Sequence, residues 1–166
     1  LAQGVLAVLV AGAIAGPALA SARRDYLHSQ PDNRFRAVAW LDAHASPGSK
    51  LWLEEGGPLP PTSRYLATYG PHVTDHPLDW YVANRYDYVV LSAAAYKPVV
   101  YDNPDSNPSL RDAYLRFFQE NESRLAVAFE KNEVDAPGPS IRIYRTGYTP
   151  PQTAAEVHAD YPLAAT

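Results

Sequence analysis

The chain contains no cysteine among its 166 residues. This absence excludes disulfide bridges, thiolate metal ligands and a cysteine nucleophile. The sequence also lacks a surplus of positive charge, because its 14 Lys and Arg residues are outnumbered by 18 Asp and Glu residues, for a formal net charge of -4. Proteins that bind nucleic acid usually carry a basic surface, so we expect no nucleic-acid partner.

Sequence motifs of common hydrolases and nucleotide-binding enzymes are missing as well. No G-x-S-x-G stretch is present to hold a nucleophilic serine. Gly56 and Gly57 are followed at once by Pro58, so they do not form the glycine-rich phosphate loop G-x-G-x-x-G. We therefore predict no catalytic residue and no cofactor in this chain. A small soluble α/β enzyme becomes the least favoured interpretation.

Two histidines and an acid lie close together in the stretch "HVTDH". His72 and His76 are four residues apart, a spacing that places two metal ligands on one face of a helix. Pro71 and Pro77 bracket the group and disfavour a helix there. Because the sequence supplies no third ligand, we predict no metal site.

A long apolar segment opens the chain, since residues 1–22 carry no charged side chain. A membrane-spanning helix needs about 20 predominantly apolar residues, and this segment reaches that length. No Met precedes it, so we expect the polypeptide to begin further upstream. Residues 1–24 are accordingly predicted to be a transmembrane helix, the last span of a longer protein.

Two other interpretations of this segment stay open. Residues 18–20 read A-L-A, which matches the A-x-A cleavage pattern of a signal peptide, although no basic region precedes them. The segment also fits a buried helix of a soluble protein. Arg23 and Arg24 follow it directly, and the positive-inside rule places such residues in the cytoplasm, which opposes an outward-facing domain.

The part of the chain after this segment alternates between predicted helices and strands. The stretch "RFRAVAWLDAHA" follows a capping Asp32 and spaces Phe35, Val38 and Leu41 as on one face of a helix. "KLWLEE" predicts a strand with Trp52 opposite its two leucines. "YDYVVLS" predicts a second strand that is apolar on both faces, as in the centre of a covered sheet.

The remaining segments complete this pattern. Residues 56–77 are punctuated by Gly and Pro and are predicted as a connection, with room for a short helix over residues 63–69. "PLDWYVANR" predicts a short helix, and residues 93–107 are predicted as a loop. Asn107 and Pro108 begin a further helix, whose apolar stripe consists of Leu110, Tyr114, Phe117 and Phe118. "RLAVAFE" and "SIRIYRT" predict two antiparallel strands in a loose hairpin.

This order of elements predicts the fold class. Alternating helices and strands favour an α/β sandwich with a partly parallel sheet. We expect about four strands and about three helices over residues 34–146, with an antiparallel C-terminal hairpin and the apolar helix in front. Residues 147–166, rich in Pro and Ala, are predicted to form a tail.

Polar side chains follow two of the predicted strands. Glu54 and Glu55 end the first strand, and Ser92 and Tyr96 follow the second. Because ligands bind outside the carboxyl ends of strands in open α/β sheets, we take these four residues and Tyr65 as candidates for a substrate-facing surface that contacts a sugar or a headgroup. The alternative is that they are solvated loop residues. Adjacent carboxylates on a strand point to opposite faces, so Glu54 and Glu55 do not form an acid/base pair.

Several stretches occur in a familiar order. "FRAVAWLDAHASPGSKLWLEE" contains the pattern A-x-x-W-[IL], then P-x-G, then a strand that ends in Glu; the matching residues are Ala37, Trp40, Leu41, Pro47, Gly48 and Glu54. "YDYVVLS" matches a D-Y-V-V-x-S strand, and "YLRFFQENESRLAVAFEKN" with "GPSIRIYR" matches a closing helix and two strands. Over most of residues 5–145 the chain therefore resembles the C-terminal part of bacterial GT-C glycosyltransferases, the group related to protein O-mannosyltransferases and lipid A aminoarabinose transferases.

The resemblance implies a role for the chain. The parent protein would transfer a sugar from a polyprenyl-phosphate donor to an acceptor outside the cytoplasm, with its catalytic carboxylates in an early loop outside this chain. Residues 34–146 would be a non-catalytic extracytoplasmic domain at the cell membrane. Its partners would be the lipid bilayer, the upstream transmembrane part, and a lipid-linked sugar or acceptor. The alternative is a secreted or membrane-tethered α/β binding module behind a truncated signal peptide.

Overall fold

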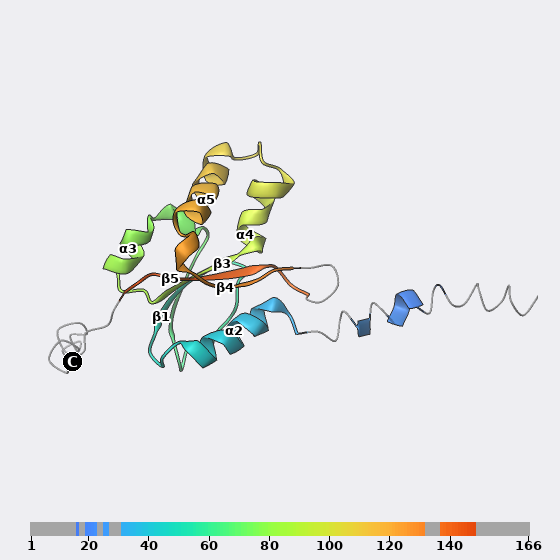
Figure 1. Ribbon diagram of the computed structural model, residues 1–166, viewed down its shortest axis with the longest axis horizontal. Coiled ribbons are helices and arrows are strands. Elements are labelled where there is room, and N and C mark those ends of the chain that lie inside the picture. Colours follow the sequence, from blue (N-terminus) through green and yellow to red (C-terminus); the bar gives the residue numbers. More distant parts are fainter. Residues whose placement is uncertain (1–15, 17–18, 23–24, 27–30, 132–136, 149–166) are drawn as a thin grey trace, which may run out of the picture.

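A mixed sheet of five strands lies at the centre of the computed structural model, which describes residues 16, 19–22, 25–26, 31–131 and 137–148 (Figure 1). The strand order is β2-β1-β3-β5-β4. Strand β1 (Lys50–Glu54) pairs in parallel with β2 (Leu66–Gly70) and with β3 (Tyr88–Ser92). Strand β5 (Ile141–Arg145) is antiparallel to both β3 and β4 (Leu125–Phe129).

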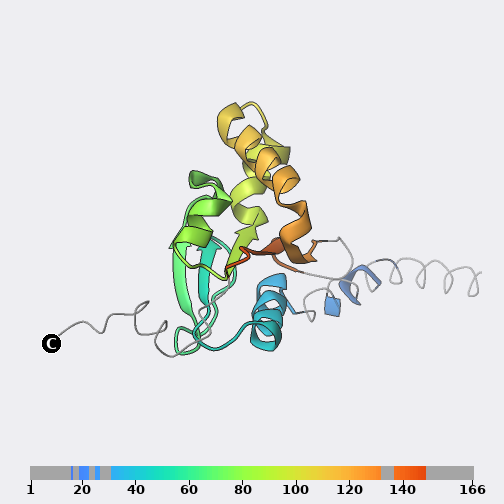
Figure 2. The ribbon, with the colours of Figure 1, turned by 60° about the vertical axis from the view of Figure 1, so that its left-hand side comes forward.

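Helices cover both faces of this sheet. Helix α2 (Asn33–His44) lies on one face. Helices α3 (Leu78–Ala83), α4 (Ala93–Lys97) and α5 (Pro108–Glu120) lie on the other, as Figures 1 and 2 show from two directions. The predicted α/β sandwich, its partly parallel sheet and its antiparallel C-terminal strands are thus confirmed. The expected number of about four strands was one too low.

The alternation of side chains along the strands divides the core in two. Leu51 and Leu53 of β1 pack on the side of α2, and Trp52 between them packs on the side of α3 and α5. All five residues of β3 are buried, which confirms the prediction of a central strand covered on both faces. The core beneath α2 contains Ala37, Leu41, Tyr65, Tyr88, Val90, Ile141 and Ile143. The opposite core contains Tyr81, Val89, Leu91, Tyr96, Tyr114, Phe117 and Tyr144.

The buried face of α2 differs from the predicted one. Asp32 caps the helix by accepting a hydrogen bond from the backbone N–H of Arg34, as expected. However, Asn33, Ala37 and Leu41 are the buried residues, whereas the side chain of Phe35 is 73% exposed. The reason is tertiary: the Asn33 side-chain amide donates to the carbonyls of Phe129 and Pro139, which turns this side of the helix toward the sheet.

Two segments that were predicted as connections have regular structure. The helix expected over residues 63–69 was wrong, because residues 66–70 form the edge strand β2 against β1. The loop expected over residues 93–107 was wrong in its first part, where α4 runs into a π-helical turn, η2 (Pro98–Asp102). Ser92 caps α4 through its hydroxyl, and Pro98 has a helical φ of -56° that allows the chain to continue.

Two further short turns complete the described part of the fold. The turn η1 (Val73–Asp75) joins β2 to α3, and η3 (Glu122–Arg124) joins α5 to β4. Within the described part of the chain, no helix has both the length and the apolar character needed to span a bilayer. Most of the span predicted over residues 1–24, and most of the tail predicted over residues 147–166, lie outside the described residues.

Candidate functional site

The carboxyl ends of the three parallel strands meet at one edge of the sheet. Glu54 ends β1, Ser92 ends β3 and Gly70 ends β2, which places them at the position where α/β proteins commonly bind ligands. The side chain of Glu54 is 0% exposed. A carboxylate at this position is therefore enclosed by protein rather than open to a ligand.

Three donors satisfy the Glu54 carboxylate. Oε1 accepts hydrogen bonds from the backbone N–H of Val73 at 2.8 Å and from the Tyr114 hydroxyl at 2.7 Å. Oε2 accepts from the backbone N–H of Ser92 at 2.9 Å. The donors come from η1, from α5 and from the end of β3. Glu54 thus connects one helix, one turn and two strands through a single side chain.

Burial governs the protonation of Glu54. Removal from water disfavours the charged form and raises the pKa of Glu54 to about 7, although the three hydrogen bonds act in the opposite direction. The negative charge of Asp75 adds to the upward shift. The carboxyl group therefore changes its charge near neutral pH while it remains inside the fold.

A second contact extends this arrangement toward the surface. The Tyr114 hydroxyl lies 3.0 Å from Nδ1 of His72, whose ring is half-buried. Burial beside Glu54 raises the pKa of Tyr114, so its hydroxyl stays protonated and can donate to the carboxylate. His72, Tyr114 and Glu54 form a continuous chain of hydrogen-bonding groups from the half-buried ring to the core.

The histidines of "HVTDH" do not converge on a common point. His72 contacts Tyr114, whereas His76 stacks on Trp80 with ring centroids 3.8 Å apart. Among the described residues, no group of three or more His, Asp or Glu side chains is arranged to hold a metal ion. The stretch serves to position η1 against α3 and α5.

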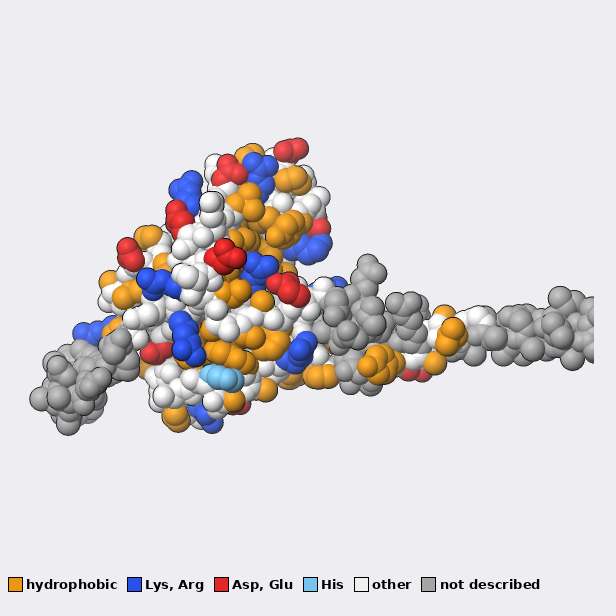
Figure 3. All heavy atoms as spheres, in the orientation of Figure 1, with side chains coloured by type: hydrophobic (Ala, Val, Ile, Leu, Met, Phe, Trp, Pro, Cys, Tyr) orange, Lys and Arg blue, Asp and Glu red, His pale blue; other side chains and the backbone are white. Residues whose placement is uncertain are grey.

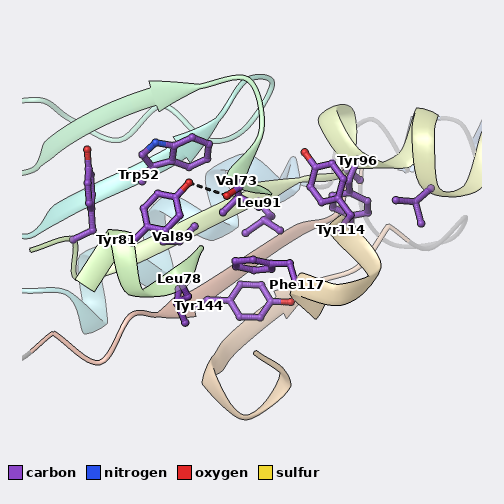
Figure 4. Packing of buried hydrophobic residues seen from close by; sticks show 13 residues of the cluster. Trp52, Val73, Leu78, Tyr81, Val89, Leu91, Tyr96, Tyr114, Phe117 and Tyr144 are labelled. Atoms are coloured by element: carbon purple, nitrogen blue, oxygen red, sulfur yellow. Dashed lines mark hydrogen bonds between the residues drawn. The ribbon is translucent and has the colours of Figure 1, made fainter. Parts of the chain in front are cut away.

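The other candidates from the sequence lie in different places. The Ser92 hydroxyl is buried, donates to the Gly56 carbonyl and accepts from the Ala94 N–H. Tyr96 is 3% exposed and packs beside Tyr114 in the core, as Figure 4 shows. Burial raises its pKa to about 12. Glu54, Ser92 and Tyr96 are thus brought together, but inside the protein.

Glu55 and Tyr65 are separate from this group. Glu55 is exposed in the turn that follows the last residue of β1, rather than on the strand as predicted. Tyr65 precedes β2, at the opposite end of the sheet, and its hydroxyl donates to Asp42 Oδ1 at 2.9 Å. It packs beneath α2 and contributes nothing to the strand ends near Glu54.

A groove that the sequence did not reveal lies between α3 and α5. It has a volume of about 460 Å³ and runs between the segment that leads from η1 into α3 and the second half of α5. Its polar lining comes from Thr74, His76, Asp79, Arg116, Glu120, Asn121 and Arg124, and its apolar lining from Pro77, Leu78, Ala113 and Phe117. In the sequence, the groove is marked by the i, i+4 spacing of Arg116 and Glu120 on α5. This spacing is common on exposed helices and does not by itself indicate a groove.

Asn121 belongs to a glycosylation motif in the sequence but has a structural role in the fold. Asn121-Glu122-Ser123 matches an N-glycosylation pattern. In the structure Asn121 is buried at the end of α5, and its side-chain amide donates to the Phe117 carbonyl at 2.9 Å. The amide nitrogen is therefore engaged in ending the helix.

The strand-end site offers hydrogen-bonding groups in fixed positions rather than a set of reacting groups. Burial raises the pKa of Glu54 to about 7, but its two oxygens are already occupied by protein donors. A general acid or base must instead reach the proton of a bound substrate.

Comparison of the chain with protein-family models, with curated proteins and with solved structures gave no match.

Proposed function

We propose that this chain is the C-terminal, non-catalytic domain of a membrane glycosyltransferase of the GT-C type. The parent enzyme transfers a sugar from a polyprenyl-phosphate donor to an acceptor outside the cytoplasm. In this proposal the domain lies on the extracytoplasmic side of the cell membrane and packs over the upstream transmembrane part of the same protein.

The state of Glu54 is the observation that carries the proposal. The edge of the sheet where α/β enzymes place their ligands is occupied by a buried carboxylate with three internal donors. A carboxylate in this state holds β1, β3, η1 and α5 together. A domain that stabilises its own fold at this edge fits an accessory role better than a catalytic one.

The residues of the GT-C resemblance have clear structural roles, which supports the same proposal. Ala37 and Leu41 fill the core beneath α2. Gly48 has a φ of +86° in the turn between α2 and β1, a conformation that favours glycine. Glu54 is the buried carboxylate. The motif thus describes a helix, a turn and a strand that ends in a structural acid, which fits a domain without chemistry of its own.

The gene sequence upstream of Leu1 tests the proposal directly. We expect several apolar spans there, with an acidic residue in the first loop outside the cytoplasm. A start codon and a cluster of Lys or Arg within about ten residues of Leu1 would instead identify a signal peptide and favour the secreted binding module.

An activity assay gives a second test. The purified chain is incubated with a polyprenyl-phosphate sugar and with candidate acceptors, and no transfer is expected. Sugar transfer by the chain alone would overturn the non-catalytic assignment.

A further inference from the structure

The groove between η1–α3 and α5 holds polar groups without partners. The Thr74 hydroxyl oxygen is buried and makes no hydrogen bond within the described structure. Asp79, Arg116 and Glu120 line the same groove, and none of them has a hydrogen bond or ion pair to another described residue. The side chains of Asp79, Arg116 and Glu120 are exposed, so their polar atoms are open to a ligand in the groove, whereas the enclosed Thr74 hydroxyl oxygen is not.

The signs of the lining charges restrict what this occupant can be. Two carboxylates, on Asp79 and Glu120, stand against two guanidinium groups, on Arg116 and Arg124. Their formal charges cancel, so neither an anion nor a cation is favoured by the site as a whole. Figure 3 shows the same mixture on the part of the surface formed by α3, α4 and α5, where acidic and basic side chains are interspersed.

The groove is also partly apolar. Leu78, Phe117 and Pro77 contribute carbon surface between the charged groups. A ligand that fits must offer hydroxyls, which donate to carboxylates and accept from guanidinium groups, together with C–H surface. Its volume of about 460 Å³ falls within the range of small-molecule sites. We propose that this groove binds a neutral saccharide, with Asp79, Arg116 and Glu120 as the residues that contact its hydroxyls.

The fold holds one wall of the groove in place before any ligand arrives. The Val73 N–H is bonded to Glu54, and the Val73 carbonyl accepts from the Tyr81 hydroxyl at 2.8 Å, which Figure 4 shows as a dashed line. Thr74 follows Val73 directly. On the other wall, Arg124 donates to the Thr146 carbonyl, so it is restrained as well. Such preorganisation lowers the entropic cost of binding.

This inference deepens the proposed function and rests on it for the choice of sugars to be tested. In a domain that accompanies a glycosyltransferase, a saccharide groove would hold the acceptor or a sugar already attached to it. Binding is measured with the full chain alone, whereas the proposed function is tested on the upstream gene sequence. Failure of one is therefore distinguishable from failure of the other.

The experiment is an NMR titration of the full chain with mannobiose and chitobiose, with inorganic phosphate as a separate arm. We expect saturable shifts of the amide signals of Thr74, His76 and Asn121 with one of the disaccharides, at millimolar affinity. Absence of these shifts with both disaccharides, saturable shifts away from the groove only, or a response to phosphate alone would overturn the proposal.

One variant and a matched control locate the binding. Arg116→Gln removes a charged donor from the lining of the groove. We expect Arg116→Gln to weaken disaccharide binding about tenfold or more, because hydrogen bonds to charged groups are the stronger ones. Arg145→Gln changes an exposed arginine that does not line the groove and should leave the affinity unchanged. Equal losses in Arg116→Gln and Arg145→Gln would refute the assignment.

Discussion

Replacing Glu54 with glutamine removes the charge and keeps the size of the side chain. Glutamine has one carbonyl oxygen and one NH₂ group, whereas both oxygens of the Glu54 carboxyl group accept backbone N–H groups and keep lone pairs for this when the group is protonated. Whichever way the amide is oriented, its NH₂ faces the N–H of Val73 or of Ser92. One buried donor then lacks an acceptor, which costs about 2 kcal/mol of stability.

The wild-type chain loses stability as the pH rises, which reduces its advantage over Glu54→Gln. The folded chain takes up a proton on Glu54 more readily than the unfolded chain, because burial raises its pKa from 4.5 to about 7. The contribution of Glu54 to stability is thus fully present below pH 4.5 and is lost as the pH rises through 7. The shift in pKa corresponds to about 3 kcal/mol.

The lost hydrogen bond and the pKa shift together predict that the stability curves of the wild type and Glu54→Gln cross as the pH rises. The wild type should be more stable than Glu54→Gln by about 2 kcal/mol near pH 4, equally stable near about pH 6, and less stable by about 1 kcal/mol at pH 8. The assay is urea unfolding of both full chains, followed by tryptophan fluorescence at several pH values. Other titrating groups contribute equally to both proteins, so the difference reports on Glu54.

Two results would refute this reasoning. A difference that stays constant from pH 4 to 8 would mean that Glu54 does not titrate in this window. A wild-type advantage that grows with pH would mean that the three hydrogen bonds outweigh the cost of burial. The control is Glu55→Gln, which alters the exposed neighbour and should change stability by less than about 0.5 kcal/mol.

Three further substitutions test the contacts around the sheet, each by urea unfolding. Tyr114→Phe removes the hydroxyl between Glu54 and His72 and should cost about 1–3 kcal/mol; an unchanged midpoint would mean that the hydroxyl is not buried against the carboxylate. Gly70→Ala places a Cβ 2.5 Å from the Trp52 ring and should cost about 1–3 kcal/mol, with a changed tryptophan emission, whereas a neutral result would contradict the close packing of β2. Asn33→Ala breaks two hydrogen bonds from α2 to the C-terminal strands and should cost about 2 kcal/mol; faster hydrogen exchange should appear in α2 first, and unaltered exchange would argue against the anchor.

Much of the layered fold could be predicted from the sequence. Runs of apolar side chains predict strands β1 and β3, and both strands are buried on both faces as this composition indicates. Helix α5 was predictable from its Asn107 cap, its Pro108 and its apolar stripe. These are local signals, each contained within one element.

What the sequence did not predict depends on distant partners. Strand β2 has the composition "LATYG" and mostly exposed side chains, so it is held by its pairing with β1 rather than by an apolar pattern. The burial of Glu54 needs Tyr114, which is 60 residues away, together with Val73 and Ser92. An acidic residue at the end of a strand is normally expected to be exposed to solvent. Only the folded chain shows which hydrogen-bond donors surround Glu54.

The anchoring of Asn33 has a mechanical consequence. The Asn33 amide bonds to the carbonyls of Phe129 and Pro139, and its backbone N–H bonds to the carbonyl of Pro137 at 3.0 Å. The first turn of α2 is therefore linked to β4 and to the segment before β5 rather than joined to the domain by a hinge. A displacement or torque applied to the chain at Pro31 is transmitted to the antiparallel C-terminal strands as a rigid-body motion of the whole sandwich.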